Sequence, residues 1–331
     1  MIICRSPLRM SFVGGGSDLP AYYEQFGGAV VSAAINKYVF VTLNKKFDEA
    51  IRVSYSKTEN VQNVAEIEHG IVRASLNLMG INGGLEITTI ADIPSSGTGL
   101  GSSSAFTVGL LHALHAYKGE YVGADRLGQE SCHVEIDICR APIGRQDQYA
   151  AAFGGFNRIV FHKDGSVDVD PIICSQKTVQ RLQKNILMLY TGRTRSANAI
   201  LSEQSSKCAN SSNTQEIMHK MVRQTVDFAE AMQHADCDGV GEILHEAWRL
   251  KRSLTGKISD ETIDNWYETG RKAGALGGKI LGAGAGGFLM FYAPQERHQA
   301  IIHALPELRP IPVAFEPIGS KIIWFFRVFR G

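Results

Sequence analysis

The run Asp92-Ile-Pro-Ser-Ser-Gly-Thr-Gly-Leu-Gly-Ser-Ser-Ser-Ala105 joins a strand-like segment, residues 85–90, to an apolar helical pattern that begins at Ala105. A glycine- and serine-rich loop at the start of a helix presents unpaired N–H groups at the positive end of the helix dipole. Proteins commonly hold phosphate groups at such a point. Linkers also collect glycine and serine, so the run alone leaves an ordinary connection open.

Two more glycine-bearing segments favour the phosphate site. They are Arg5-Ser-Pro-Leu-Arg-Met-Ser-Phe-Val-Gly-Gly-Gly-Ser-Asp-Leu-Pro-Ala-Tyr22 and Lys279-Ile-Leu-Gly-Ala-Gly-Ala-Gly-Gly-Phe-Leu-Met-Phe-Tyr292. The three segments, in this order, resemble the motifs of the GHMP kinases, the superfamily of galactokinase, homoserine, mevalonate and phosphomevalonate kinases. The resemblance covers nearly the whole chain and implies a kinase that uses ATP and Mg²⁺.

The alternation of patterns predicts the fold class. Strand-like and helix-like segments mix without strict βαβ alternation, so we predict an α+β fold. The resemblance implies a mixed-sheet N-terminal domain and a ferredoxin-like C-terminal domain. A polar run after Pro171 sets the predicted domains at residues 1–175 and 176–331. The expected strands include residues 2–5, 9–13, 30–34, 38–43, 51–54, 85–90, 156–161, 185–190, 288–292 and 321–329. The expected helices cover residues 64–78, 103–117, 124–137, 196–205, 213–234, 238–254 and 260–275.

Composition limits the function classes. The chain of 331 residues carries 34 basic and 33 acidic residues, a net charge of +1, which gives no general reason to expect nucleic acid or an anionic membrane as a partner. Six scattered cysteines form no Cys-x-x-Cys pair, which favours reduced thiols. The chain begins without a signal-peptide pattern, and no apolar run reaches the ~18 residues of a membrane span. We therefore expect a cytoplasmic protein with a small-molecule substrate; a homodimer stays open.

The central loop is the predicted ATP site. It is similar to the family motif Pro-x-x-x-Gly-Leu-Gly-Ser-Ser, and the residues predicted to bind the nucleotide are Pro94, Ser96, Gly97, Gly99, Leu100, Gly101, Ser102, Ser103 and Ser104. The third segment supplies Gly282, Gly284, Gly286 and Gly287, which the resemblance places beside the phosphate loop. These glycines also fit G-x-G-x-x-G, but that dinucleotide fingerprint requires a strand before it and a helix after it, the reverse of what is expected here. Glycines of a tight helix-to-strand turn are the other interpretation.

Other kinase and metal signatures are absent from the sequence. It has no G-x-x-x-x-G-K-[ST] loop, no H-E-x-x-H, no zinc-like histidine spacing, and none of the H-R-D and D-F-G signatures of protein kinases.

Asp147 is the predicted catalytic carboxylate. It lies in Pro142-Ile-Gly-Arg-Gln-Asp-Gln-Tyr-Ala-Ala-Ala-Phe-Gly-Gly155, which resembles the segment that carries the catalytic aspartate in galactokinase-like enzymes. Phosphoryl transfer to an alcohol needs a carboxylate that takes or orients the hydroxyl proton. The alternative is a turn aspartate that caps the next helix. Arg9 matches an arginine of the family and is predicted to stabilise the transferring group or lower the pKa of the acceptor hydroxyl.

Glu135 and Ser103 are the predicted magnesium ligands. The resemblance places a metal-binding glutamate twelve residues before the catalytic aspartate, and a carboxylate with a hydroxyl, completed by phosphates and water, suits octahedral Mg²⁺. Glu130 and Asp137 are competing candidates nearby, and a glutamate on a solvated helix face is the plain alternative.

Asp18 matches the aspartate that binds sugar hydroxyls in galactokinases. The segment before it departs from their Gly-Glu-His-Thr-Asp-Tyr pattern, because Gly15 and Gly16 replace the glutamate and the histidine. This loss argues against galactose and for a different or bulkier sugar. The Gly-Gly-Gly-Ser-Asp variant resembles the heptose-phosphate kinase branch of the family, whose members convert D-glycero-D-manno-heptose 7-phosphate to the 1,7-bisphosphate. Fucokinase-like enzymes share much of this pattern.

A phosphorylated sugar needs an anion site of its own. The turn Tyr190-Thr-Gly-Arg-Thr-Arg-Ser-Ala197 offers Arg193 and Arg195 close to an expected helix start, which suits a phosphate monoester. A solvated basic turn is an equally good interpretation, and Lys37, Arg140 and Arg145 are lesser candidates. The predicted function is phosphorylation of the anomeric hydroxyl of heptose 7-phosphate. The alternatives are a kinase of a free sugar such as fucose or galactose and, more remotely, a catalytically silent sugar sensor.

Overall fold

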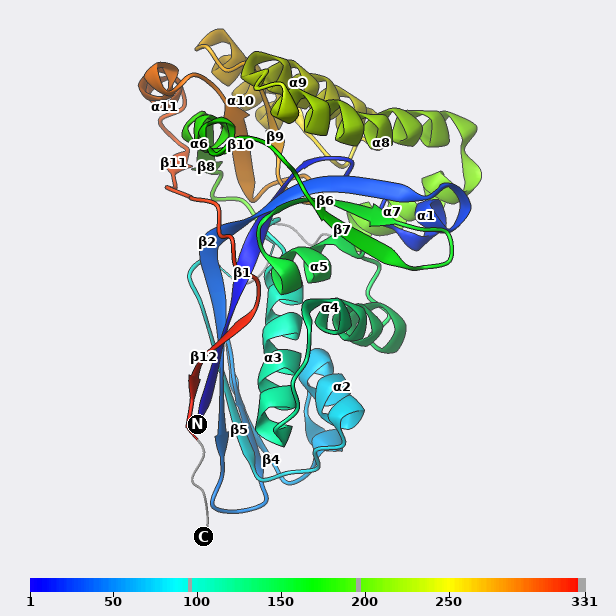
Figure 1. The fold of residues 1–331 in the computed structure, drawn as a ribbon, viewed down its shortest axis with the longest axis vertical. Helices are drawn as coiled ribbons and strands as arrows, with labels where there is room; N and C mark the ends of the chain where they lie inside the picture. The colour runs from blue at the N-terminus through cyan, green and yellow to red at the C-terminus, as the bar shows by residue number, and fades with distance from the viewer. Residues whose placement is uncertain (95–96, 195–197, 327–331) are drawn as a thin grey trace.

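The computed structural model describes residues 1–94, 97–194 and 198–326, which form two sheets with surrounding helices (Figure 1). The first sheet has the order β12-β1-β2-β5-β3-β4, and β6 pairs with β2 and with β7. Its neighbours are antiparallel except β3 and β5, which run parallel, so the predicted mixed sheet is confirmed. Its strands are β1 (Ile2–Val13), β2 (Gly28–Lys45), β3 (Ile51–Ser54), β4 (Thr58–Val61), β5 (Leu85–Ala91), β6 (Phe156–Phe161), β7 (Val167–Pro171) and β12 (Lys321–Phe325).

β1 forms one long strand where the sequence predicts two. Pro7 lacks an N–H donor, and the pairing with β2 shifts register between Pro7 and Leu8, so the strand passes the proline at an irregularity. Burial alternates at the start of β1 and is continuous from Ser6 to Val13. A strand covered on both faces shows continuous burial, and this half of β1 lies between α3 and α5 on one side and α8 and α9 on the other.

Helices cover one face of the first sheet (Figure 1). They are α2 (Gly70–Met79), α3 (Ser102–Lys118), α4 (Ala124–Cys132) and α5 (Gln146–Phe153), with a π-helical turn (His133–Ile138) directly after α4 and a 3₁₀ turn (Val64–Glu66) before α2. α3 lies against β1 and β2, and its apolar residues are almost all buried, which positions its N-terminus close to the buried half of β1. α1 (Pro20–Phe26) is a short helix that follows β1.

The second sheet has the order β11-β8-β10-β9, and all three of its pairings are antiparallel. Its strands are β8 (Ile186–Tyr190), β9 (Gly277–Ile280), β10 (Phe288–Tyr292) and β11 (Arg309–Pro310). The sequential strands thus take the spatial order 4-1-3-2, and the predicted ferredoxin-like arrangement is confirmed. The accompanying helices are α6 (Gln176–Lys184), α7 (Asn198–Asn210), α8 (Ser212–Gln233), α9 (Cys237–Leu254), α10 (Glu261–Lys272) and α11 (His298–Ala304), with a 3₁₀ turn at Gln295–Arg297.

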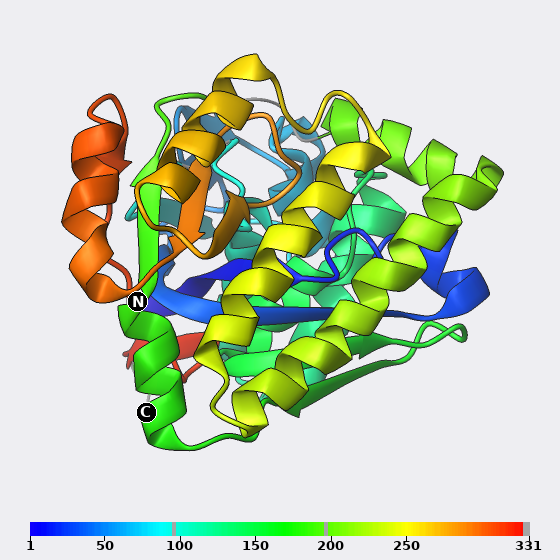
Figure 2. The ribbon, with the colours of Figure 1, turned by 90° about the horizontal axis from the view of Figure 1, so that it is seen from above.

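α8 and α9 pack side by side across β1 and β2, which Figure 2 shows from above. The largest apolar cluster consequently extends from Phe12 and Val31 to Phe228 and Leu244. At the end of the described chain β12 returns to pair with β1. The predicted domain boundary at residue 175 stays a prediction. Among the described residues, every helix is too short or too polar to cross a membrane.

Candidate active site

The predicted phosphate loop leads into α3, and its glycines have backbone conformations that other residues rarely adopt. Gly97, Gly99 and Gly101 have φ values of 69°, 77° and 76°, a left-handed region that glycine adopts without strain. A methyl group at Gly99 would lie 2.3 Å from the carbonyl oxygen of Leu281. The side-chain oxygen of Ser102, in the first turn of α3, is buried and has no hydrogen-bond partner within the described residues. The loop thus leaves both backbone and hydroxyl donors at a helix N-terminus.

The third glycine segment packs directly against this loop. A methyl group at Gly282 would lie 2.5 Å from the Cα of Gly99, and one at Gly287 would lie 2.3 Å from the carbonyl oxygen of Thr98. Gly282, Gly284, Gly286 and Gly287 all have positive φ values. The second and third glycine-bearing segments therefore meet at one place, although they lie far apart in the sequence.

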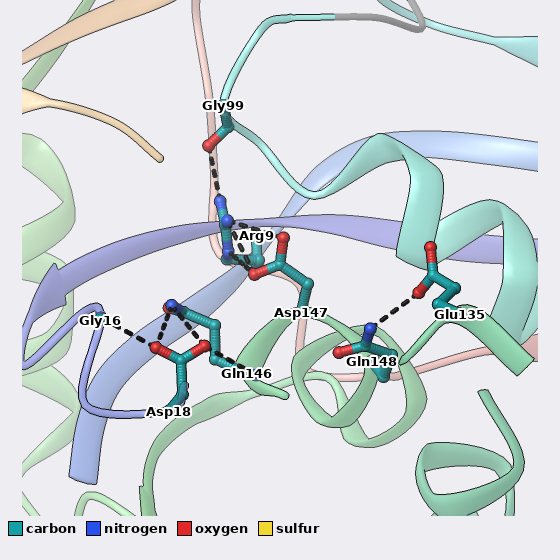
Figure 3. A network of polar contacts seen from close by, with 8 residues as sticks. All are labelled: Arg9, Gly16, Asp18, Gly99, Glu135, Gln146, Asp147 and Gln148. Carbon is teal, nitrogen blue, oxygen red and sulfur yellow. Dashed lines mark hydrogen bonds and ion pairs between the residues drawn. The ribbon is translucent and has the colours of Figure 1, made fainter. Parts of the chain in front are cut away.

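Arg9 and Asp147 form a bidentate pair at the centre of the site (Figure 3). Arg9 Nε donates to Asp147 Oδ1 at 2.8 Å and Nη2 donates to Oδ2 at 2.9 Å. Nη1 donates to the carbonyl oxygen of Gly99 at 2.7 Å, so Arg9 also ties the pair to the phosphate loop. Burial raises the pKa of Asp147, the Arg9 charge opposes this shift, and the charge of Asp18 adds to it. The carboxylate is thus held in a fixed orientation beside the loop.

Close to this pair, the carboxylate of Asp18 accepts hydrogen bonds from a second group of donors. Its Oδ1 accepts from the backbone N–H of Gly16 at 2.8 Å, and the amide of Gln146 donates to both carboxylate oxygens at 3.1 Å (Figure 3). The backbone of residue 144 passes so close that a methyl group there would lie 1.8 Å from Asp18 Oδ2. The carboxylate is buried, and its position is set by the backbone of two separate segments.

The buried residues Glu135 and Gln148 form a third group with Ser103, which is exposed. Ser103 Oγ donates to Glu135 Oε1 at 2.9 Å, and Gln148 Nε2 donates to Oε2 at 2.7 Å. Glu135 lies in the π-helical turn after α4, a feature that is common at functional sites. Burial raises the pKa of Glu135, and hydrogen bonds from Ser104, Ser103 and Gln148 oppose this shift. Among the competing candidates, Glu130 instead binds His115 and Arg126, and Asp137 pairs with His133.

These groups line one cleft of about 710 Å³. The predicted residues along its wall are Arg9, Gly15, Gly16, Asp18, Gly97, Gly99, Gly101, Ser102, Ser103, Ser104, Glu135, Asp147, Gly282, Gly284 and Gly286. Pro94, Leu100, Gly287 and Arg193 are described but lie outside this wall. Ser96 and Arg195 lie outside the described residues.

Arg193 points to a different place from the one that its predicted role requires. Its guanidinium donates to both carboxylate oxygens of Asp260, at 3.2 and 2.5 Å, and lies 5.9 Å from the centre of the Trp266 ring. Its carbonyl oxygen accepts from the N–H of Gly287 at 2.7 Å. In this position Arg193 connects the third glycine segment to the start of α10, and the geometry does not favour it as a phosphate ligand in the cleft.

The residues of the cleft wall that sequence reasoning missed include Ser11, Gln146, Lys251 and Lys279. Gln146 directly precedes the predicted catalytic aspartate, so its place in the motif was an available signal. Ser11 lies in the first glycine-bearing segment, but a serine in a strand carries no specific signal. The two lysines belong to a helix and a strand of the second half, where lysine ordinarily marks an exposed face.

The chain matches two family models, one described as the GHMP kinases N terminal domain, over residues 69–155, and one as the GHMP kinases C terminal, over residues 228–310. It is 29% identical over 322 residues to a D-glycero-alpha-D-manno-heptose 7-phosphate kinase of Campylobacter jejuni, with 91% of this chain and 92% of that protein covered. It is 25% identical to a bifunctional fucokinase/GDP-fucose pyrophosphorylase of Arabidopsis thaliana, with 87% of this chain but only 29% of that protein covered.

The fold is similar to a crystal structure from Bacteroides thetaiotaomicron described as a D-glycero-D-manno-heptose 1-phosphate kinase. The TM-score is 0.82 and the identity 24%, and the match covers 99% of this chain and all of the other. Kinases of this family use ATP as the phosphate donor. The chain belongs to the GHMP kinase family, and it is a phosphotransferase with an alcohol group as acceptor.

Proposed function

We propose that the protein transfers the γ-phosphoryl group of ATP to the anomeric hydroxyl of D-glycero-D-manno-heptose 7-phosphate, giving the 1,7-bisphosphate and ADP. The observation that carries this proposal is the Arg9–Asp147 pair, which is tied to the phosphate loop at Gly99 and lies in the same cleft as the Asp18 group. A donor site, a proton acceptor and a hydroxyl-binding carboxylate are the three parts that an alcohol kinase needs.

In this proposal each group has one task. Asp18 and Gln146 bind ring hydroxyls and orient the sugar. The anomeric oxygen attacks the γ-phosphorus as the bond to ADP breaks, and its proton passes to Asp147. Arg9 keeps the carboxylate in position and faces the negative charge that develops on the transferring group. Most of the rate enhancement would come from positioning the reactants and neutralising charge.

Glu135 and Ser103 fit a magnesium ion. A carboxylate and a hydroxyl 2.9 Å apart at the cleft wall offer the hard oxygen donors that Mg²⁺ prefers, and a cation would offset the burial of Glu135. Mg²⁺ keeps several ligands from phosphates and water, so two protein ligands are enough. When bound, the ion would neutralise charge on the ATP phosphates.

The named relatives support a heptose phosphate as the acceptor. The Campylobacter jejuni relative, matched over nearly its whole length, is named for heptose 7-phosphate. The interpretation that Gly15 and Gly16 leave room for a bulkier sugar is supported only at position 15. A methyl group at Gly16 would lie 2.0 Å from Nε2 of Gln204, which already fills this space, whereas one at Gly15 would meet its nearest atom at 3.5 Å.

A kinase of a free sugar is the second candidate, because the fucokinase relative matches 87% of this chain. The test is incubation of the purified protein with Mg-ATP and a panel of sugars and sugar phosphates, with ADP release and product mass as readouts. The proposal expects turnover on heptose 7-phosphate, with the new phosphate on the anomeric carbon. Turnover only on an unphosphorylated sugar would contradict the proposal and support the second candidate, a kinase of a free sugar.

A further inference from the structure

Two lysines of the second half of the chain reach the cleft. Lys251 lies on α9 and Lys279 on β9, and they are only 4% and 5% exposed. Both side chains line the cleft that contains the Arg9–Asp147 pair. Lysine is rarely buried to this extent without a partner charge, so their position calls for a function.

Their hydrogen bonds lead to one short segment after the middle of β1. Lys251 Nζ donates to the carbonyl oxygen of Gly15 at 3.2 Å, and Lys279 Nζ donates to that of Phe12 at 3.1 Å. An ammonium group has three N–H donors, and within the described part of the chain neither lysine has a carboxylate within ion-pair distance. Asp18, whose charge acts on Lys251, already accepts bonds from Gly16 and Gln146.

No carboxylate of the described residues forms an ion pair with either lysine, although Asp18, Glu135 and Asp147 line the same cleft. Burial lowers the pKa of Lys251; the charges of Asp18 and Cys208 oppose this effect, and the charge of Arg9 adds to it. Burial lowers the pKa of Lys279 further, and the charges of Lys251 and Arg9 act in the same direction. Three cationic side chains thus interact in a cleft where only Arg9 has an ion-pair partner among the described residues. A buried cation without a counter-charge is unfavourable, and a bound anion would remove this cost.

The location indicates which anion fits. The phosphates of ATP have their donors at the loop and the start of α3. The lysines instead contact Phe12 and Gly15, on the side of the cleft where Asp18 and Gln146 lie. The hydroxyl of Ser11, the residue directly before Phe12, is buried and has no hydrogen-bond partner in the described structure; a methyl group at Gly15 would lie 3.5 Å from it. Two ammonium groups and a hydroxyl match the charge and the acceptor oxygens of a phosphate monoester.

We propose that Lys251, Lys279 and Ser11 form the subsite that binds the phosphate group which the acceptor sugar already carries. This inference rests on the proposed function, because a free sugar would have no group to place there. It assigns the charged groups that recognise a phosphorylated substrate to the second half of the chain, and it replaces Arg193 in that role.

The test compares a sugar phosphate with the same sugar lacking the phosphate. The kcat and KM of the full-length protein are measured with heptose 7-phosphate, with free heptose and with ATP, for the unaltered protein, Lys251→Met, Lys279→Met and the control Arg249→Met. Arg249 lies on the same helix as Lys251, but its side chain is 61% exposed. Each lysine variant should raise KM for heptose 7-phosphate about ten- to a hundredfold, the effect of losing one charged hydrogen bond. KM for ATP and kcat/KM for free heptose should change by less than about threefold, and the control should match the unaltered protein.

Thermal unfolding separates this role from a structural one. Removal of a buried charge that lacks a partner is neutral or stabilising, so Lys251→Met should keep or raise the melting temperature while it loses affinity for the sugar phosphate. If a lysine variant fails to fold, inhibition of the unaltered protein by inorganic phosphate supplies the test. Phosphate should compete with heptose 7-phosphate and not with ATP. Competition with ATP alone would contradict the subsite.

The outcomes keep the two proposals apart. If the unaltered protein prefers heptose 7-phosphate and the lysine variants keep that preference, the subsite is wrong and the proposed function stands. If the unaltered protein acts only on free sugars, the proposed function fails and the subsite fails with it. If the variants lose the preference as described, both are supported.

Discussion

Replacement of Asp147 by asparagine removes the proposed proton acceptor with almost no change in side-chain volume. In the unaltered protein the Asp147 carboxylate accepts hydrogen bonds from Arg9 Nε at 2.8 Å and from Nη2 at 2.9 Å. An asparagine has one carbonyl oxygen, so it can keep one of these bonds, while its NH₂ group would face an Arg9 donor. The charge that takes the hydroxyl proton is lost.

The expected magnitude follows from these two losses. Loss of a general base costs about a hundred- to ten-thousandfold in rate, and kcat of Asp147→Asn should fall within this range. The Asp147 side chain is 23% exposed, so water can replace part of the lost bonding, and the free energy of unfolding should change by no more than about 2 kcal/mol. KM for ATP should stay within about threefold, because the ATP phosphates are expected to contact the loop and not the carboxylate.

The assay is ADP release at saturating Mg-ATP and sugar, together with thermal unfolding of the same preparations. Asp137→Asn is the matched control, since Asp137 is another aspartate close to the site in sequence but its side chain is 62% exposed and pairs with His133. A kcat within tenfold of the unaltered protein, with unfolding unchanged, would refute the role of Asp147. An equal loss in the control would show that the assay responds to surface charge.

Three further predictions concern the groups around this pair. Gly144→Ala would place a methyl group 1.8 Å from Asp18 Oδ2, so it should raise KM for the sugar by about tenfold or more, and an unchanged KM would contradict the role of Asp18. Glu135→Gln should raise the Mg²⁺ concentration for half-maximal rate by about tenfold or more; a titration that matches the unaltered protein would remove Glu135 as a ligand. Hydrogen bonds to Glu130 raise the pKa of buried His115, so their stabilisation is complete below the ordinary histidine pKa and is lost as pH rises through the folded-state value. The melting temperature of His115→Gln should therefore differ more from that of the unaltered protein at about pH 6 than at about pH 9, and an equal or reversed difference would contradict this assignment.

The hydrophobic pattern of the sequence was sufficient to predict most helices and strands, but it could not reveal the tertiary contacts that interrupt them. The helix expected over residues 64–78 is a 3₁₀ turn followed by α2, which begins at Gly70. The carboxylate of Glu59 accepts from the backbone N–H groups of Glu68 and His69 and so holds the chain in a non-helical form between them. This contact joins β4 to a segment several residues away, and hydrophobic periodicity carries no record of it.

The candidate site shows a similar division. The glycine segments could be found in the sequence because their function depends on backbone conformation, and only glycine adopts it easily. α5 was missed, since its eight residues show little amphipathic pattern within a motif that resembles a turn. Lys251 was also missed, because its helical segment looks like that of any exposed lysine. Its burial results from α9 crossing β1, a tertiary contact that no local pattern records.

The proposed phosphate-binding lysines lie apart from the other groups of the cleft along the chain. Arg9, Asp18, Glu135 and Asp147 all precede β6, on elements that pack around the buried half of β1. The lysine that approaches Gly15 comes from α9, which crosses β1 and also contacts α6, α8 and β9. Substitution on α9 can therefore change what the cleft binds without moving the carboxylate–arginine pair, since that pair is held by the backbone of β1 and the phosphate loop. In the proposed subsite the two charged groups come from α9 and β9, neither of which holds the Arg9–Asp147 pair, so the same reacting groups could serve a free sugar or a sugar phosphate.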